Sequence, residues 1–472
     1  MKIYFILSCL CFTLFGAQQP NIILILADDL GGAGLSCYGN EFFETPNIDA
    51  LAAKSMRFDN AYSGSTVCAP SRACLMSGQY VGRHKITWVS QFQRDYIKKK
   101  RGPNLNGFRL LQPVHPYHMP EGTITLGQAF KDAGYATAMF GKWHLGHRPQ
   151  DQPDKMGFDE YLTFQGMKHF APYTLPNKVQ HGEKVYLTDL TCDKAIDFME
   201  RKVAAEKPFF LYYPDFLVHA PMEAKQAMIQ YFEKKAVGQH HKSVIGAAMT
   251  KHLDDTVGRL IKKVEELGIA ENTIIVFTSD NGGLGYKSDG GYGDKGTSNY
   301  PYRSAKSSHY EGGSRVPLIF HWPGVTEANS LSHEVVSGID IYPTLLKIAQ
   351  VAKPQAQILD GIDFSSILKN PKQKLPARDL FHYQPIYNHK VFGDASVSVR
   401  RGDMKYIYYF VEENFELFNL KDDVSQKKDL SADYPELCEE LKKACFKHLD
   451  ETDAPRMTLN SDYDPKLKVQ FK

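Results

Sequence analysis

The chain has 472 residues, of which 43% are hydrophobic and 23% charged, a composition typical of a globular protein and not of a disordered or fibrous one. Its 56 basic residues nearly balance 54 acidic residues, so the formal net charge is only +2. This balance excludes a polycation that binds nucleic acid through its overall charge, although it allows a local basic pocket. The length would allow about three domains of ~150 residues, or one large α/β domain with an appendage.

The N-terminal residues have the pattern of a secretory signal. An almost unbroken apolar run over residues 3–16 follows Lys2 and is too short to span a membrane. We predict a signal peptide over residues 1–17; a buried N-terminal strand and, more weakly, a lipoprotein anchor at Cys9 are the alternatives. No later run approaches 18 apolar residues, and no Asn-x-Ser/Thr acceptor occurs. The sequence therefore predicts a secreted or periplasmic bacterial protein without a membrane span.

Four continuous apolar runs have the pattern of strands that are buried on both faces of a sheet. They cover residues 21–27, 133–140, 208–213 and 273–278. Between them, residues 243–267 place apolar side chains at three- and four-residue steps, which predicts an amphipathic helix that Gly268 ends. The alternation predicts an α/β fold with a large, mainly parallel central sheet flanked by helices. In such sheets the ligand site lies beyond the carboxyl ends of the strands.

The pattern changes beyond about residue 370. Residues 370–376 resemble a linker, residues 435–449 resemble an amphipathic helix, and short strand-like runs lie between them. Those runs cover residues 395–400, 405–411 and 415–420. We predict a smaller C-terminal antiparallel sheet with one helix, and we divide the mature chain into domains at 18–372 and 373–472.

Paired oxygen ligands follow two of the predicted strands. Asp28 and Asp29 end the first strand, and Asp280 and Asn281 end the fourth. Adjacent carboxylates repel each other unless a cation or hydrogen bonds compensate. Alone, the first pair could be a solvated turn or a helix cap, but four oxygen ligands on neighbouring loops favour Ca²⁺ or Mg²⁺ over zinc.

Six cysteines remain outside the predicted signal, and their spacing fits neither a disulfide scaffold nor a structural zinc site. Cys68 begins the segment Cys68-Ala69-Pro70-Ser71-Arg72. A thiol beside Arg72 could be a nucleophile, whereas a lone cysteine in a loop is more often a packed side chain. Cys74, Cys438 and Cys445 are predicted to pack in the interior.

Six motifs occur in order along nearly the whole mature chain. They are Asp28-Asp29, residues 68–72, 141–146, 219–221 and 279–283, and Lys306 ahead of residues 310–317. Together they resemble the type I, formylglycine-dependent sulfatases of the alkaline-phosphatase superfamily. The resemblance implies an alkaline-phosphatase-like fold, which agrees with the predicted large sheet and smaller C-terminal part, and it implies a sulfuric ester hydrolase.

The resemblance also implies a cofactor and a modified residue. A divalent ion, usually Ca²⁺ with Mg²⁺ as the alternative, would be held by Asp28, Asp29, Asp280 and Asn281. A maturation enzyme would convert Cys68 to formylglycine during export, and the hydrated aldehyde would attack the sulfate ester and then release sulfate by collapse of a hemiacetal.

The remaining site residues receive their roles by the same resemblance. Arg72 would stabilise the hydrate, and Lys142 and Lys306 would bind the sulfate oxygens. His144 would be the base for the release step, and His219 would contact the sulfate or assist the leaving oxygen. Taken singly, the two lysines could be solvated side chains and the two histidines could be structural.

The substrate is predicted to be a sulfated carbohydrate. Six basic residues lie in a short stretch that could attract a polyanionic glycan or could be a solvated face. They are Arg94, Lys98, Lys99, Lys100, Arg101 and Arg109. Tyrosines in and after a glycine-rich loop, namely Tyr286, Tyr292, Tyr300 and Tyr302, could stack on sugars. The alternatives are a phosphate or phosphonate monoester hydrolase of the same fold, and a non-catalytic glycan-binding protein with an unmodified Cys68.

Overall fold

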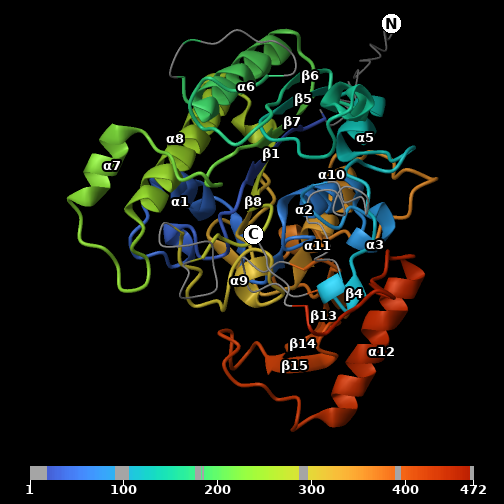
Figure 1. Ribbon diagram of the computed structural model, residues 1–472. Coiled ribbons are helices and arrows are strands. Elements are labelled where there is room, and N and C mark those ends of the chain that lie inside the picture. Colours follow the sequence, from blue (N-terminus) through green and yellow to red (C-terminus); the bar gives the residue numbers. More distant parts are fainter. Residues whose placement is uncertain are drawn as a thin grey trace, which may run out of the picture.

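The structure is a computed structural model that describes residues 19–90, 106–175, 182, 185–285, 296–387 and 395–467. The predicted signal peptide, Arg94 to Arg101 of the basic stretch, Tyr286 and Tyr292 lie outside the described residues. A large sheet between two layers of helices forms the upper part of the molecule in Figure 1, and a smaller sheet with one helix forms the lower part. The predicted fold class is therefore confirmed.

The large sheet has eight strands, and every neighbouring pair that does not include β9 is parallel. In spatial order the strands are β10 (Ser330–Ser332), β2 (Met56–Phe58), β9 (Leu318–His321), β8 (Thr273–Ser279), β1 (Asn21–Ala27), β7 (Phe209–Pro214), β5 (Ala136–Phe140) and β6 (Glu160–Leu162). β1 pairs in parallel with β7 and β8, whereas β9 is antiparallel to β2 and β8. The prediction of a mainly parallel sheet holds, and the four predicted strands are β1, β5, β7 and β8.

The continuous apolar run of β1 is explained by burial on both faces. Ile22, Leu24 and Leu26 belong to one hydrophobic cluster, and the alternating Ile23 and Ile25 belong to the other. Burying each of these side chains contributes about 1.5–3 kcal/mol. A strand with this pattern is therefore stable only between two helical layers.

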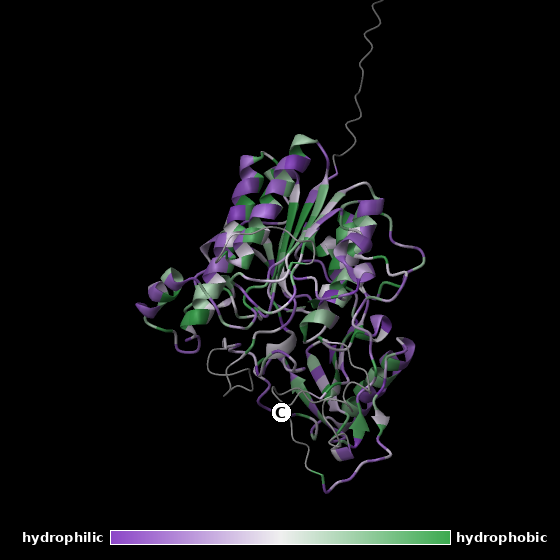
Figure 2. Ribbon diagram, turned by 45° about the horizontal axis from the view of Figure 1, so that its top comes forward, coloured by the Kyte–Doolittle hydropathy of each residue, from purple (hydrophilic) through white to green (hydrophobic). Residues whose placement is uncertain are grey.

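Helices cover both faces of the sheet, which Figure 2 shows as hydrophobic strands between helices that are polar on their outer sides. One layer consists of α1 (Pro46–Ala53), α6 (Leu187–Ala204) and α8 (Val244–Glu266). The other consists of α2 (Cys68–Ser77), α5 (Leu126–Asp132), α10 (Gly338–Ile348) and α11 (Ser365–Lys369). The Ser243 side chain caps α8 by accepting from the Gly246 amide, and Gly268 follows its end with φ +68°, so this predicted helix is confirmed.

The C-terminal part is a four-stranded antiparallel sheet with a helix on one face. Its elements are β12 (Asp379–Gln384), β13 (Ser396–Arg401), β14 (Met404–Tyr409), β15 (Asn414–Asn419) and α12 (Pro435–Glu451). Cys438 and Cys445 are buried where α12 packs on the sheet, as predicted. β12 is not among the predicted strands, and the boundary between residues 372 and 373 stays a prediction.

The remaining elements are short. The helices are α3 (Val81–His84), α7 (Gln226–Glu233) and α9 (Glu311–Ser314), with 3₁₀ turns at η1 (Ser36–Tyr38), η3 (Pro149–Asp151), η4 (Pro153–Met156) and η5 (Ala270–Asn272). Two-stranded ladders join β3 (Ala61–Tyr62) to β11 (Val336–Ser337) and β4 (Leu110–Leu111) to β16 (Thr458–Leu459). Among the described residues, no helix has the length and apolar character that crossing a membrane requires.

The carboxyl ends of the central strands meet at one edge of the sheet. Ala27 at the end of β1 pairs with Ser279 at the end of β8, which brings Asp28 beside Asp280. On the other side of β1, the Lys142 amide after β5 donates to the Pro214 carbonyl at 2.8 Å. Gly141 permits this approach, because it has φ +140° and a Cβ there would lie 1.9 Å from the Pro214 oxygen.

Candidate active site

Asp28 and Asp29 are fully buried at the end of β1. Asp29 has φ +62°, a left-handed conformation that is strained for a residue other than glycine. Its amide donates to Asp280 Oδ1 at 3.2 Å, and its Oδ1 accepts from Asn281 Nδ2 at 2.7 Å. The two predicted acidic motifs are therefore in direct contact, and these hydrogen bonds hold the Asp29 backbone in its unusual conformation.

Cys68 is the first residue of α2 and lies against both acidic residues. Its Sγ is 3.5 Å from Asp28 Oδ1, 3.7 Å from Asp29 Oδ1 and 2.9 Å from Lys306 Nζ. Burial raises the pKa of the Cys68 thiol far more than Lys142 and Lys306 lower it. An unmodified Cys68 is therefore a protonated thiol and a poor nucleophile at neutral pH.

Arg72 lies one helical turn after Cys68, and its guanidinium is fully buried. It donates to Asp280 Oδ2 from Nε at 2.9 Å and to the Lys142 carbonyl from Nη1 at 2.6 Å. Asp280 raises the pKa of Arg72 despite burial, so the side chain stays charged. These hydrogen bonds connect α2 to the loops that follow β8 and β5.

Two lysines point at the acidic pair from separate loops. Lys142 Nζ donates to Asp28 Oδ2 at 2.5 Å, and Lys306 Nζ donates to Asp29 Oδ1 at 2.6 Å. Both lysines are at most 8% exposed. Burial raises the pKa of Asp29, but Lys306 and His219 outweigh it and hold that pKa below its usual range. The two cations thus neutralise buried carboxylates on either side of Cys68, as buried charge requires.

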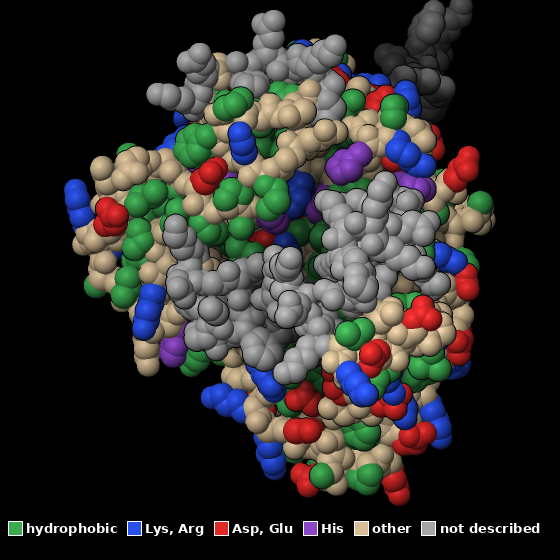
Figure 3. Space-filling model, viewed as in Figure 1, with side chains coloured by type: hydrophobic (Ala, Val, Ile, Leu, Met, Phe, Trp, Pro, Cys, Tyr) green, Lys and Arg blue, Asp and Glu red, His purple; other side chains and the backbone are tan. Residues whose placement is uncertain are grey.

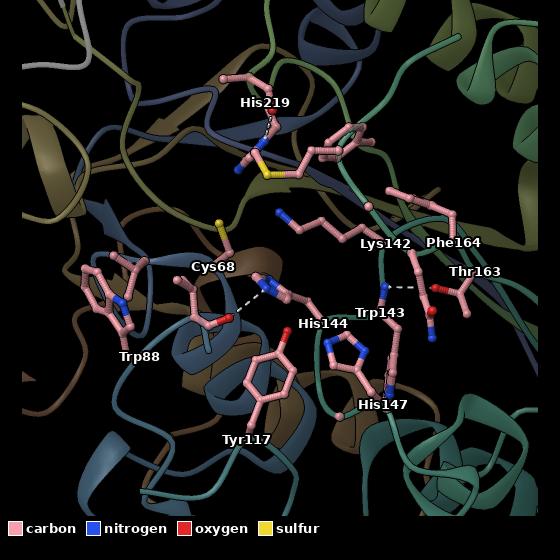
Figure 4. Close-up of a pocket in the computed structure, with 18 of the residues that line it drawn as sticks. Cys68, Trp88, Tyr117, Lys142, Trp143, His144, His147, Thr163, Phe164 and His219 are labelled. Carbon is pink, nitrogen blue, oxygen red and sulfur yellow. Dashed lines mark hydrogen bonds between the residues drawn. The ribbon is translucent and has the colours of Figure 1, made fainter. Parts of the chain in front are cut away.

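The two predicted histidines flank Cys68 in Figure 4. His144 Nε2 donates to the Val89 carbonyl at 3.2 Å, while its buried Nδ1 has no hydrogen-bond partner. Burial, Lys142 and Arg72 hold the pKa of His144 well below its usual range, so the ring is neutral and can accept a proton. His219 Nε2 lies 3.6 Å from Asp29 Oδ2, and burial and Lys142 lower its pKa well below the usual range although Asp29 raises it.

His219 is held by a stack of rings that sequence reasoning missed. The Phe216 ring stacks on His219 at 5.1 Å and on the buried His169 at 4.4 Å between ring centroids. His169 Nε2 also donates to the His219 carbonyl at 2.8 Å. No local motif marks His169 or Phe216, because their role arises only when the two loops fold against each other.

The predicted metal ligands fit a divalent cation. Asp29 Oδ2 and Asn281 Oδ1 are buried and have no hydrogen-bond partner. Burial and Asp28 raise the pKa of Asp280 despite Arg72, which is the consequence of acidic groups crowded together. Two of the predicted ligands, Asp28 and Asp29, each place a carboxylate oxygen within 4.8 Å of the other and of a ligand atom of Cys68 and of His219. The oxygen atoms that the four predicted ligands offer suit Ca²⁺ or Mg²⁺.

A cavity of about 470 Å³ opens above Cys68, Lys142, Lys306 and the two histidines. Figure 3 shows the molecule hollowed at this point, with basic and histidine side chains inside. Aromatic side chains line the cavity, and Figure 4 shows Trp88, Tyr117 and Phe164 around the site. Tyr117 packs edge-on against His144 at 5.7 Å between ring centroids. These aromatic residues were not predicted from the sequence, because they lie outside the six motifs.

The tyrosines proposed for sugar stacking have other contacts where the structure describes them. Tyr300 stacks on His240 at 3.4 Å between ring centroids, and Tyr302 lies 5.0 Å from the Arg315 guanidinium. Arg109, the described member of the basic stretch, donates to Glu413 Oε1 at 2.9 Å. None of these three residues lines the cavity as far as the described residues define it.

The sequence resembles known sulfatases. The family profile described as Sulfatase matches residues 20–351, and the profile described as N-sulphoglucosamine sulphohydrolase, C-terminal, matches residues 304–453. The chain is 32% identical over 423 residues to N-acetylgalactosamine-6-sulfatase of Canis lupus familiaris, which covers 85% of this chain and 74% of the relative. It is 31% identical to a sulfatase of Formosa agariphila, with 89% of this chain and 85% of the relative covered.

A solved structure extends the likeness to three dimensions. The structure of Ps i-CgsB in complex with k-i-k-neocarrahexaose matches with a TM-score of 0.77 at 29% identity and covers 94% of this chain and 96% of that chain. The sulfatase profile itself spans more than half of this chain. The chain therefore belongs to the formylglycine-dependent sulfatase family of the alkaline-phosphatase superfamily and is a sulfuric ester hydrolase.

Proposed function

We propose that this sulfatase is an exported enzyme that hydrolyses sulfate monoesters on a sulfated carbohydrate and that residue 68 acts as formylglycine. The observation that carries the proposal is the environment of Cys68. This side chain lies at the floor of the cavity, 2.9 Å from the Lys306 ammonium, and its pKa is raised by burial. A buried, protonated thiol is a poor nucleophile, so the position needs a different reactive group.

A hydrated aldehyde at position 68 would supply two hydroxyl groups, one for attack on sulfur and one for the later release of sulfate. The chain's own residues bind the substrate around it. Lys142 and Lys306 lie on either side of residue 68 and provide cations for the sulfate oxygens, where negative charge increases in the transition state. Because both cations are buried, they act in a medium that screens them less than water does.

Proton transfer is assigned to the two histidines. The low pKa of His144 keeps its ring neutral, and its unpartnered Nδ1 can accept a proton during sulfate release. His219 lines the same cavity beside Asp29 and is assigned to the leaving-group side of the ester. Arg72 holds Asp280 and the Lys142 backbone in place, and through them it orients the groups around residue 68.

A divalent cation, Ca²⁺ with Mg²⁺ as the alternative, is assigned to Asp28, Asp29, Asp280 and Asn281. When bound, it would polarise a sulfate oxygen as a Lewis acid. The buried, unpartnered oxygens of Asp29 and Asn281 support this assignment.

A carbohydrate substrate is supported by the cavity and by the relatives. Aromatic side chains such as Trp88 and Tyr117 offer apolar faces for sugar rings while the lysines bind the charged group. The relatives described above include an N-acetylgalactosamine-6-sulfatase and a protein bound to neocarrahexaose. We assign export to residues 1–17, conversion of Cys68 to a formylglycine-generating maturation enzyme, and the two domains to residues 18–372 and 373–472.

Two measurements test the proposal. Mass spectrometry of the peptide spanning Cys68, from protein expressed together with the maturation enzyme, should show formylglycine; only unmodified thiol in an active preparation would contradict the proposed nucleophile. Sulfate release should have a much larger kcat/KM for sulfated saccharides than hydrolysis of the corresponding phosphate esters. A preference for phosphate would favour the phosphate or phosphonate hydrolase alternative, and binding without turnover would favour the glycan-binding alternative.

A further inference from the structure

The C-terminal sheet buries its polar face. Over residues 381–384 of β12 and 396–400 of β13 the residues alternate between apolar and polar, and the polar ones are at most 5% exposed: His382, Gln384, Ser396, Ser398 and Arg400. The apolar residues between them, including Tyr383 and Val397, pack in the cluster that contains Leu441 of α12. An alternating strand usually turns its polar face to water. Here that face lies against the large domain, so its polar groups need protein partners.

Gln384, at the end of β12, has two such partners on different loops. Its Oε1 accepts from Thr66 Oγ1 at 2.7 Å, and its Nε2 donates to the Ser307 carbonyl at 3.1 Å. The Ser307 amide also donates to the Thr66 carbonyl at 2.9 Å. Thr66 lies two residues before Cys68, and Ser307 directly follows Lys306. One buried amide thus connects the loop of the nucleophile to the loop of a sulfate-binding cation.

Two other polar residues of the same sheet face each form a hydrogen bond to only one of these two loops. His382 Nε2 donates to the Ser63 carbonyl at 2.9 Å on the nucleophile side. Ser396, which pairs with Gln384 across the sheet, meets His309 at 3.1 Å on the lysine side. Gln384, in contrast, forms hydrogen bonds to both loops with a single side chain.

We propose that Gln384 is a positioning residue that sets the Lys306 ammonium relative to residue 68, although it touches neither group. A lysine side chain is flexible, so the direction of its ammonium depends on where its backbone is held. The Ser307 carbonyl that Gln384 binds belongs to the residue next to Lys306, whose Nζ lies 2.9 Å from Cys68 Sγ. The inference rests on the roles proposed for residue 68 and Lys306.

A double-mutant cycle tests this inference. Gln384→Met keeps the length of the side chain but removes both hydrogen bonds. In the mature enzyme we expect kcat for 4-nitrophenyl sulfate to fall by about 10-fold or more with KM changed by less than about 3-fold, as misplacement of a transition-state contact predicts. In the Lys306→Gln background, the same change should lower kcat by no more than about 2-fold. Equal losses in both backgrounds, or no loss in either, would overturn the inference.

Three controls separate the possible causes. Formylglycine content, measured by mass spectrometry for every variant, corrects kcat for incomplete maturation. Ser398→Ala changes a residue of the same buried face whose Oγ has no hydrogen-bond partner, so its kcat should match the wild type. Thr66→Val removes one of the two Gln384 hydrogen bonds without altering β12. If Gln384→Met does not fold, Thr66→Val takes its place in the double-mutant cycle. If Lys306→Gln alone retains full activity, the role proposed for Lys306 is wrong, an outcome distinct from additivity in the cycle.

Discussion

At the residue scale, the site consists of buried charges that neutralise one another. Arg72, Lys142 and Lys306 pair with three aspartates at the end of the sheet, and every one of these side chains is at most 10% exposed. Burial of an unpaired charge is costly, so removal of one partner leaves the other uncompensated. The motifs predicted which residues meet here. They did not predict that Arg72 would bond Asp280, because that contact depends on how α2 packs against the sheet.

The neutral state of His144 leads to a prediction for its alanine variant. His144→Ala should lower kcat by about 100- to 10,000-fold, the range expected when a positioned proton acceptor is lost. Steady-state kinetics of the mature enzyme with 4-nitrophenyl sulfate would measure the change. His333→Ala, which alters an exposed histidine paired with Asp59, is the control and should retain wild-type kcat. A His144→Ala enzyme with nearly full kcat would exclude His144 as the proton acceptor.

The proposed cation site predicts an effect on stability as well as on activity. Removal of divalent cations with a chelator should abolish turnover, and adding back Ca²⁺ should restore it. Ca²⁺ at 100 times its dissociation constant should stabilise the folded protein by about 2.7 kcal/mol, because it binds the folded state alone. Asn281→Ala should lose most of this Ca²⁺-dependent rise in thermal midpoint. If chelation leaves both the midpoint and kcat unchanged, the cation assignment fails.

At the element scale, long buried elements could be predicted from sequence and short or polar ones could not. The strands β1 and β8 are continuously apolar because both faces are covered, and the period of α8 is regular over 23 residues. In contrast, β12 contains His382 and Gln384, whose burial against the loop that holds Ser63 and Thr66 is a tertiary effect. A strand of six residues that alternates apolar and polar residues only over its last four positions carries too weak a signal to separate it from the linker before it.

The packing of α12 on β12 predicts a pH dependence of stability. His448 stacks on Phe381 with ring centroids 4.0 Å apart, and burial lowers its pKa to about 4. An unfolded histidine has a pKa of about 6.5. As the pH falls from about 6.5 to 4, the unfolded state therefore binds a proton that the folded state does not, and the free energy of unfolding decreases. Below about pH 4 both states are protonated and the loss stops growing.

His448→Phe keeps an aromatic ring in the stack but cannot titrate. Between pH 7 and pH 5, the wild type should lose about 2 kcal/mol more of its free energy of unfolding than this variant. Urea unfolding at the two pH values would measure the difference. A His448→Phe variant with an unchanged pH dependence would contradict a titration at this position.

At the scale of the whole molecule, a buried ion pair joins the C-terminal sheet to α9. Lys405 of β14 donates to Glu311 Oε1 at 2.7 Å, and the other carboxylate oxygen accepts from Tyr62 OH at 2.7 Å. Burial raises the pKa of Glu311, but Lys405 and Arg315 outweigh it and lower that pKa to about 2. Because this pKa is below the unfolded value of about 4.3, the pair stabilises the fold above that pH and loses its effect as the pH falls toward 2.

Breaking this pair from one side should be more harmful than removing it entirely. Lys405→Met leaves the buried Glu311 carboxylate with Arg315, at 3.5 Å, as its remaining ion-pair partner and should lower the free energy of unfolding by up to about 3–5 kcal/mol. Adding Glu311→Gln to Lys405→Met removes the uncompensated charge and should restore part of the loss. Urea unfolding of the two variants at pH 7 would measure both effects. If the double variant is no more stable than Lys405→Met, an uncompensated charge is not the cause.

The sequence by itself determined the fold class and the family, and it predicted the residues of the candidate site. Hydrophobic periodicity and strand-end motifs such as Asp28-Asp29 involve residues that are close together in sequence, so they can be recognised without the tertiary structure. Tertiary structure alone decided which aromatic side chains line the cavity, how the Phe216 stack holds His219, and that Gln384 reaches the loop that precedes Cys68. Those contacts join residues far apart in sequence, Thr66 and Gln384 being 318 positions apart. Their geometry depends on how the layers pack, which no local pattern encodes.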